Sequence, residues 1–180
     1  YIVDADADIM GDFSFDYIPP MSKRKNTTYV WSARNPVNGL EYGYGGVKLF
    51  PKVQLLDLGH ELPDYTTGAS FYQPISDVSN ITRFNKDPYR TWRSAFRECV
   101  KLASSVNPNQ KQKETDERLE TWCTTDVGAR FGRYCLKGAL EGKEYGIANK
   151  DDNEALVKIN DFEWLREQFV ASMKKRVTDK

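Results

Sequence analysis

The chain has 180 residues, and its 26 Lys and Arg side chains are balanced by 26 Asp and Glu. This neutrality removes the main electrostatic reason to expect non-specific binding to nucleic acid or to anionic membranes. No run approaches the roughly 18 apolar residues of a membrane span, and there is no signal peptide, so we expect no membrane partner and a cytoplasmic location. The length favours a single domain over residues 1–180.

The chain opens on an apolar, strand-like segment, residues 1–3, that runs directly into an acidic stretch. Asp4, Asp6 and Asp8 follow at a spacing of two and present hard oxygen ligands where the chain leaves the strand. Such ligands suit Mg²⁺ or Mn²⁺ better than a soft metal. Because a natural protein seldom starts in the middle of a strand, we also expect the sequence to be a fragment of a longer chain.

Two other interpretations of the acidic stretch remain open. Its spacing begins like an EF-hand calcium loop, but Ile9 and Phe15 stand where that loop needs Gly and Glu. The second alternative is a solvated turn with no ligand. A buried strand before the aspartates and a loop after them favour the metal.

Strands and loops are expected to continue to about residue 85. Residues 12–18 alternate apolar and polar side chains loosely, residues 27–33 are rich in β-branched and aromatic side chains, and residues 47–50 follow a glycine-rich turn. In that turn Gly45 and Gly46 would let the backbone approach a ligand closely, and Tyr44 offers a flat ring for stacking. The alternative is a glycine-rich hairpin whose tyrosines pack over a sheet edge.

Residues 86–180 are expected to be helical. Asp87 as N-cap and Pro88 at the first helical position predict one helix start, and further helices are predicted at about 115–123 and 127–141, the latter closed by Gly142. Asn160 with Glu163 has the capping-box pattern of a last helix. Strands followed by helices predict an α/β or α+β unit with a mixed sheet.

Cys99, Cys123 and Cys135 lack CxxC spacing and neighbouring histidines, which favours reduced thiols over a zinc site or a disulfide framework.

A resemblance to a known family rests on several of these segments together. The strand, the Asp-x-Asp stretch and the later segment Gly45-Gly46-Val-Lys-Leu-Phe50 resemble the second half of a GT-A-type glycosyltransferase domain. With residues 76–80 (Ser-Asp-Val-Ser-Asn) and 92–98 (Trp-Arg-Ser-Ala-Phe-Arg-Glu), the sequence looks like glycosyltransferase-like proteins of tailed phages. The general resemblance covers about residues 1–55 and the narrower one reaches about residue 140. The nucleotide-binding strands that precede the metal motif in such enzymes are absent from this sequence.

The resemblance implies a group that faces the reacting sugar carbon and a third metal ligand. Asp77, in a Ser- and Asn-rich segment taken as a loop after the sheet, is the first candidate for the catalytic group, and Asp64 is the second. For both, a turn or capping role is the alternative. His60, the single histidine, is the candidate third ligand, with an ordinary surface histidine as the alternative.

Arginine binds diphosphates well because its guanidinium can donate two parallel hydrogen bonds. Arg83 and Arg93 stand just before or on the helix that starts near Pro88, and a solvated, ion-paired helix face is the alternative there. The residues expected to bind donor or acceptor are Arg34, Asn35, Tyr44, Gly45, Gly46, Lys48, Arg83 and Arg93.

Together these expectations describe a GT-A-like α/β domain, the second half of that fold with a helical C-terminal part. It would move a sugar from a nucleotide-diphosphate donor with Mn²⁺ or Mg²⁺, in an infected bacterial host if phage-encoded. The acceptors considered are a protein, a glycan or modified phage DNA. The alternative is a non-catalytic structural or virion-associated protein that retains the fold.

Overall fold

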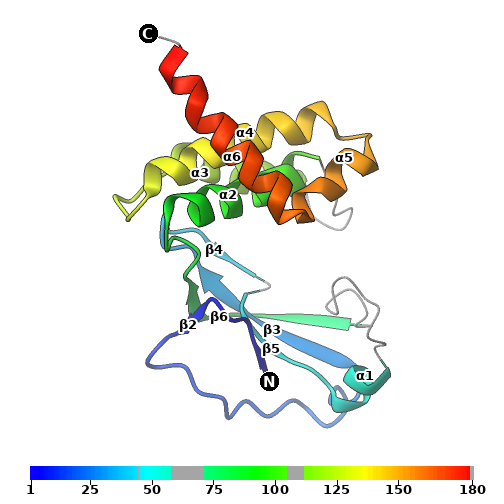
Figure 1. Cartoon of the computed structure of the whole chain (residues 1–180). Coiled ribbons are helices and arrows are strands. Elements are labelled where there is room, and N and C mark those ends of the chain that lie inside the picture. The colour runs from blue at the N-terminus through cyan, green and yellow to red at the C-terminus, as the bar shows by residue number, and fades with distance from the viewer. Residues whose placement is uncertain (44, 58–70, 105–111, 179–180) are drawn as a thin grey trace. The chain divides into compact units, whose positions relative to one another are not determined.

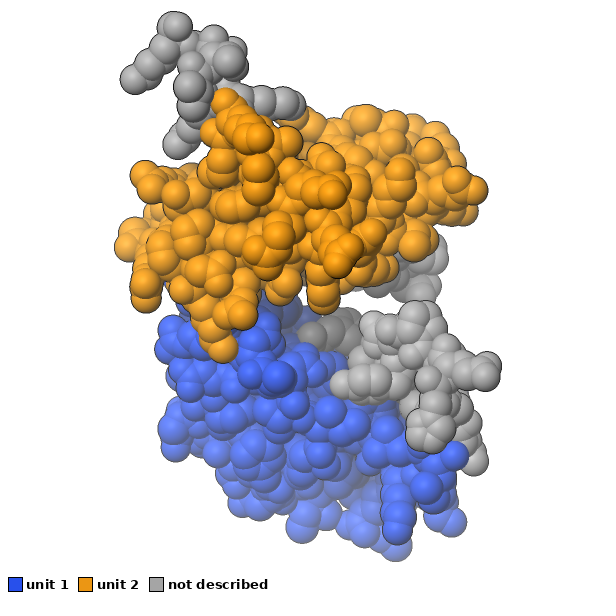
Figure 2. Space-filling view, in the orientation of Figure 1, with its two compact units in different colours: residues 1–83 blue, residues 84–180 orange. Residues whose placement is uncertain are grey.

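The computed structural model describes residues 1–43, 45–57, 71–104 and 112–178. The chain divides into two compact units, Tyr1–Arg83 (unit 1) and Phe84–Lys180 (unit 2), which Figure 2 colours separately. Unit 1 contains the sheet, and all described helices except a short one belong to unit 2. The predicted α/β class with a mixed sheet is therefore confirmed at this level (Figure 1).

Unit 1 is built on a mixed sheet with the strand order β1-β5-β3-β6-β2, in which β4 also pairs with β3. The central strand β3 runs parallel to β6 and antiparallel to β5. A short helix, α1 (Lys52–Asp57), follows β5. The strands are β1 (Ile2–Val3), β2 (Ala7–Ile9), β3 (Thr27–Arg34), β4 (Glu41–Tyr42), β5 (Val47–Leu49) and β6 (Phe71–Thr82).

Aromatic side chains form the core around β3. Tyr29 and Trp31 are buried there, as the β-branched and aromatic composition of this segment predicts. The strand predicted at residues 12–18 is wrong, because these residues form an irregular segment with no strand pairing. Their alternation nevertheless places Phe13 and Tyr17 against the Trp31 ring, with centroid distances of 5.7 and 5.5 Å. The periodicity therefore identified the packing face but not the backbone hydrogen bonding.

Strand β6 includes the segment around Asp77 that was predicted to be a loop. Trp31 pairs with Ile75 and Ser32 with Val78, so Ser76 and Asp77 bulge out of the parallel register. Pro and Asp are disfavoured in strands, so a strand that contains them, with a bulge, is hard to predict from sequence. Asp77 thus lies within a strand, exposed at a β-bulge, and the loop prediction for it is wrong.

Unit 2 is helical, and α2 is in contact with α3, α4 and α6. The predicted start of α2 is confirmed, since Asp87 is the N-cap and its side chain accepts a hydrogen bond from the Arg90 N–H at 2.7 Å. The helical elements are α2 (Pro88–Ala103), α3 (Gln112–Thr124), α4 (Gly132–Ala148), α5 (Asn153–Val157), the 3₁₀ turn η2 (Lys158–Asn160) and α6 (Phe162–Thr178).

Two helix boundaries in unit 2 differ from prediction. Helix α4 starts five residues later than predicted, at Gly132, and continues through Gly142, where a Cβ would lie 2.3 Å from the Phe96 carbonyl oxygen of α2. Gly142 therefore permits close helix packing and does not end the helix. The cap of α6 is Asp161, whose Oδ1 accepts from Glu163 and Trp164 N–H, so the predicted Asn160 cap is wrong.

Aromatic residues of α2 lie at the centre of the hydrophobic core of unit 2. Trp92 and Phe96 stack at 4.7 Å between ring centroids and pack with Leu165 of α6. In the part of the chain that the structure describes, no helix has both the length and the apolarity that crossing a membrane requires.

Candidate functional site

The acidic stretch forms a tight turn that bridges two different strands of the sheet. β1 pairs with β5 and β2 pairs with β6, and only Asp4, Ala5 and Asp6 separate β1 from β2. The Asp4 N–H donates to the Gly46 carbonyl oxygen at 2.8 Å, and the Arg83 N–H donates to the Asp6 carbonyl oxygen at 2.7 Å. The backbone of this acidic turn (residues 4–8) is therefore held at both ends.

The carboxylates of the acidic turn have different partners. Asp4 accepts from the Lys48 ammonium, with Nζ 3.0 and 3.2 Å from its two oxygens. The Lys48 side chain is 8% exposed and that of Asp4 is 40% exposed, so the ion pair is half-buried. Asp8 forms an exposed ion pair with Arg83 at 2.9 Å. Asp6 is exposed and forms no side-chain hydrogen bond or ion pair within the described residues.

The side chains of the acidic turn can be compared with the ligands that a divalent cation needs. Over residues 1–43, 45–57, 71–104 and 112–178, no group of three or more His, Cys, Asp or Glu side chains gathers as a metal cage. A cation that also binds the phosphates of a ligand needs only one or two protein carboxylates. Asp4 and Asp6 are of the right chemical kind for that smaller set. His60, the predicted third ligand, lies outside the described residues.

The glycine pair of the adjoining turn is required by strand packing. A Cβ on Gly45 would lie 2.7 Å from the Trp31 carbonyl oxygen, and a Cβ on Gly46 would lie 2.8 Å from the Ala7 Cβ. The protein itself therefore fills the space that the sequence analysis had reserved for a ligand at these two positions. Tyr44 lies outside the described residues.

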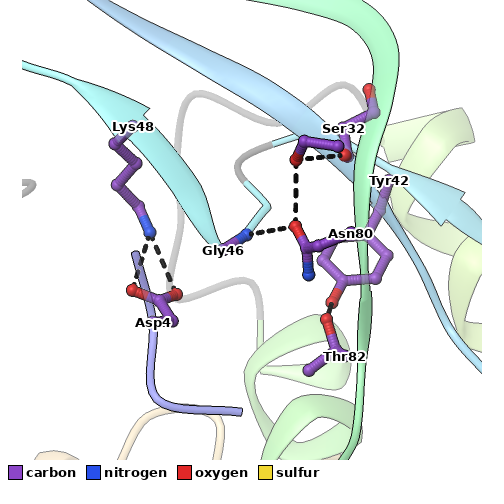
Figure 3. A network of polar contacts seen from close by, with 8 residues as sticks. Asp4, Ser32, Tyr42, Gly46, Lys48, Asn80 and Thr82 are labelled. Atoms are coloured by element: carbon purple, nitrogen blue, oxygen red, sulfur yellow. Dashed lines mark hydrogen bonds and ion pairs between the residues drawn. The ribbon is translucent and has the colours of Figure 1, made fainter. Parts of the chain in front are cut away.

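A buried amide connects β6 to the glycine pair (Figure 3). Asn80 is fully buried, and its Oδ1 accepts from the Gly46 N–H at 3.2 Å and lies 3.0 Å from the Ser79 hydroxyl. Its Nδ2 is enclosed and has no hydrogen-bond partner. Nearby, the hydroxyls of Tyr42 and Thr82 share a hydrogen bond of 2.6 Å.

Three segments that are distant in sequence therefore meet at one place. The acidic turn bonds to Gly46, Gly46 bonds to Asn80, and Lys48 on the same strand bonds back to Asp4. These are the segments on which the family resemblance rested. Asn80 belongs to the segment 76–80, but its place in the site is not evident from the sequence. The only available signal was an amide flanked by the strand-forming residues Val78 and Ile81.

The remaining predicted residues have other surroundings. Arg34 forms an ion pair with Glu41 at 2.7 Å at the end of β3. Asn35 is buried and orders the following loop, because its Oδ1 accepts from the N–H groups of Val37 and Asn38. Neither contacts the acidic turn through a hydrogen bond or ion pair.

Two further predicted residues within the described part of the chain form no hydrogen bond or ion pair with the acidic turn. Asp77 lies on β6, three residues before Asn80, and is exposed. Arg93 belongs to unit 2, where it packs against aromatic rings. Asp64 lies outside the described residues.

No family model matches this sequence, and comparisons with curated proteins and with solved structures give no match.

Proposed function

We propose that the chain is a GT-A-like, metal-dependent glycosyltransferase domain that moves a sugar from a nucleotide-diphosphate donor to an acceptor. One observation carries the proposal: carboxylate side chains and the cationic side chains of Lys48 and Arg83 alternate around a single turn whose backbone is held by hydrogen bonds. The exposed Asp6 lies between the Asp4–Lys48 and Asp8–Arg83 ion pairs. The hydrogen bonds from this turn to Gly46, and from Gly46 to Asn80, add support, because the resemblance drew on the same segments.

The mixed charge of the turn suits a diphosphate bound together with a divalent cation. Asp4 and Asp6 would hold Mn²⁺ or Mg²⁺, and Lys48 and Arg83 would face the phosphate oxygens. When bound, the cation neutralises negative charge on the leaving diphosphate. In its absence, Lys48 keeps the Asp4 carboxylate in place at the end of the strand.

Asp77 remains the candidate for the group that faces the reacting sugar carbon. It is an exposed carboxylate at a bulge in β6, and bulges commonly re-aim side chains beside active sites. In that role it would accept a proton from the acceptor or stabilise the reacting face of the sugar. The acceptor would be a protein, a glycan or modified phage DNA.

The proposal is tested by donor turnover in the full chain. Nucleotide release from a panel of uridine, guanosine and cytidine nucleotide sugars is measured with Mn²⁺ and with EDTA. Asp6→Asn should lower the Mn²⁺-dependent rate at least tenfold, since a neutral amide is a poorer metal ligand. Asp12→Asn, the same change at an exposed position beyond β2, should leave the rate unchanged.

Absence of both turnover and donor binding would contradict the proposal. If no nucleotide sugar is consumed and none raises the melting temperature in the presence of Mn²⁺, the non-catalytic alternative is favoured. If turnover occurs, Asp77→Asn should lower it roughly 100-fold with little change in donor affinity, because a catalytic contact is made mainly in the transition state. Unchanged turnover in that variant would transfer the role to Asp64.

A further inference from the structure

Arginines and aromatic rings alternate along one face of unit 2, where α2 lies beside the start of α6. Two rings, Tyr89 and Phe162, each contact two guanidinium groups. The Tyr89 hydroxyl donates to the Phe162 carbonyl oxygen at 3.0 Å, which ties the two helices together here. This arginine ladder consists of Arg166, Tyr89, Arg93, Phe162 and Arg97 in order of contact.

The cation–π distances of the arginine ladder are short. The Arg166 guanidinium carbon is 4.6 Å from the Tyr89 ring centroid, and that of Arg93 is 4.6 Å from the Phe162 centroid. Arg93 also reaches the Tyr89 ring at 5.5 Å, and Arg97 reaches Phe162 at 5.6 Å. Distances under about 6 Å are those at which a cation is attracted to the face of a ring.

None of these three arginines forms an ion pair with a carboxylate among the described residues. Other arginines of the chain are paired, as Arg118 is with Glu98 at 2.8 Å and Arg90 is with Asp87 at 3.5 Å. Burial, and next the charge of neighbouring Arg93, lower the pKa of Arg97, while the charge of Glu98 opposes the shift. Glu98 offsets part of this charge, but Arg93 and Arg97 form no ion pair within the described residues, so their like charges keep an electrostatic cost that an anion would relieve.

The ladder also has unused hydrogen-bond donors and an accessible ring. Each guanidinium carries five N–H donors. Arg97 donates one hydrogen bond, to the Asn160 side chain at 2.8 Å, and the side chains of Arg93 and Arg166 donate none within the described residues. The Phe162 side chain is 53% exposed despite its size. The Nε atoms of Arg93 and Arg97 are buried without a partner among the described residues, so the donors available to a phosphate beside this open ring are the terminal Nη groups.

The charge of unit 2 agrees with an anionic ligand. Phe84–Lys180 holds 19 Lys and Arg against 16 Asp and Glu, whereas Tyr1–Arg83 holds 7 against 10. The whole chain is neutral because unit 1 has a net negative charge and unit 2 has a net positive charge of the same size. The basic unit is the one that carries the unpaired arginines.

We propose that the arginine ladder binds single-stranded nucleic acid. The three guanidinium groups would contact successive phosphates, and the exposed Phe162 ring would stack on a base. A cationic face with interleaved aromatic rings is the arrangement by which proteins bind single strands without sequence preference. This inference does not rest on the proposed transferase activity, because it concerns unit 2 and is tested by binding alone.

Fluorescence anisotropy of a labelled oligothymidylate with the full chain tests the proposal. Three phosphate contacts predict that the logarithm of the association constant falls with the logarithm of salt concentration at a slope of about −2, at roughly 0.7 per contact. Arg93→Gln with Arg97→Gln should weaken binding at least tenfold and reduce the slope to about −0.7. Phe162→Leu should weaken binding about tenfold with the slope unchanged, because it removes stacking and leaves the charges.

The control removes the same charge elsewhere in unit 2. Lys113→Gln with Lys150→Gln changes two exposed lysines that touch no aromatic ring. This variant should bind within twofold of wild type. Circular dichroism melting of each variant establishes that the helices remain folded, and Arg93→Lys supplies a milder change should the double variant unfold.

Three results would overturn the proposal. The first is no binding at roughly 50 mM salt, where single-strand contacts of this kind are strong. The second is equal weakening by the lysine control, which would indicate a general charge effect. The third is tighter binding of heparin than of the oligonucleotide together with no effect of Phe162→Leu, which would indicate a polyanion other than nucleic acid.

Discussion

The two units bury different kinds of polar side chain. In unit 1 the buried polar residues include a lysine and three asparagines, Lys48, Asn35, Asn38 and Asn80. In unit 2 the buried polar residues among those described are hydroxyls alone: Thr91, Ser104, Thr115 and Ser172. The difference is one of chemistry, because amides and ammonium groups need several partners and hydroxyls need few.

The partners of these groups show what the difference means. The hydroxyls of Thr91 and Ser104 donate to carbonyl oxygens of their own helical segment at 2.7 Å, so they serve local structure. Lys48 and Asn80 instead bond to distant segments that converge on the acidic turn. Burying such groups is costly unless they are paired, so the burial of Lys48 and Asn80 marks a place where position matters more than stability.

The largest expected effect concerns the apolar packing of unit 2. Gly142→Val would place a branched side chain where even a Cβ lies 2.3 Å from the Phe96 carbonyl oxygen. The two helices would have to separate, and we expect a loss of about 3 kcal/mol or more of unfolding free energy by urea denaturation. Ala148→Val introduces the same side chain at an exposed position of α4 and should cost below about 1 kcal/mol. A similar midpoint for both variants would contradict the close packing.

A second experiment separates polar burial that serves the site from polar burial that serves a loop. Asn80→Ala deprives the Gly46 N–H of its acceptor, and Asn38→Ala does the same to the Leu40 N–H. Each should lower stability by about 1–3 kcal/mol, the cost of an unsatisfied buried group. Only Asn80→Ala should also weaken Mn²⁺-dependent nucleotide binding, about tenfold per folded molecule, in calorimetric titration. Equal affinities in the two variants would remove Asn80 from the site.

The smallest expected effect is a titration within unit 2. The hydrogen bond between Cys99 and Cys123 lowers the pKa of Cys123 to about 7. Burial opposes this shift, and the charge of Lys143 favours it. The thiolate is the reactive form, so alkylation by iodoacetamide should be half-maximal near pH 7 and slow as the pH falls below it. Cys99→Ala should move this midpoint upward. Cys135, whose pKa burial raises to about 12, should not react; labelling there would contradict the packing.

Local signals in the sequence were sufficient for some elements of the fold. Asp87 and Pro88 specify the start of α2 through their own backbone geometry, and β3 is specified by its run of β-branched and aromatic residues. By contrast, β6 contains Pro74, Ser76 and Asp77, and it exists because β2 and β3 pair with it on either side. Tertiary pairing of this kind overrides propensity and leaves no local signature.

The candidate site was predictable in its parts but not in its contacts. The acidic turn and the glycine pair were both evident, but the reason for the glycines was not, because it is the approach of Ala7 and Trp31. The acceptor role of Asn80 depends on Gly46, 34 positions earlier in the chain. A single sequence contains no information on such a pairing.

The central claim is that the acidic turn binds a divalent cation together with a nucleotide, and paramagnetic broadening tests it directly. Substoichiometric Mn²⁺ is added to the ¹⁵N-labelled full chain with uridine or guanosine diphosphate, with Mg²⁺ as the diamagnetic reference. We expect the amide signals of Asp6 and Gly46 to broaden most, and we expect Asp6→Asn to abolish this broadening. Strongest broadening at the exposed Asp151 and Asp152 of unit 2, or broadening that Asp6→Asn leaves unchanged, would contradict this claim.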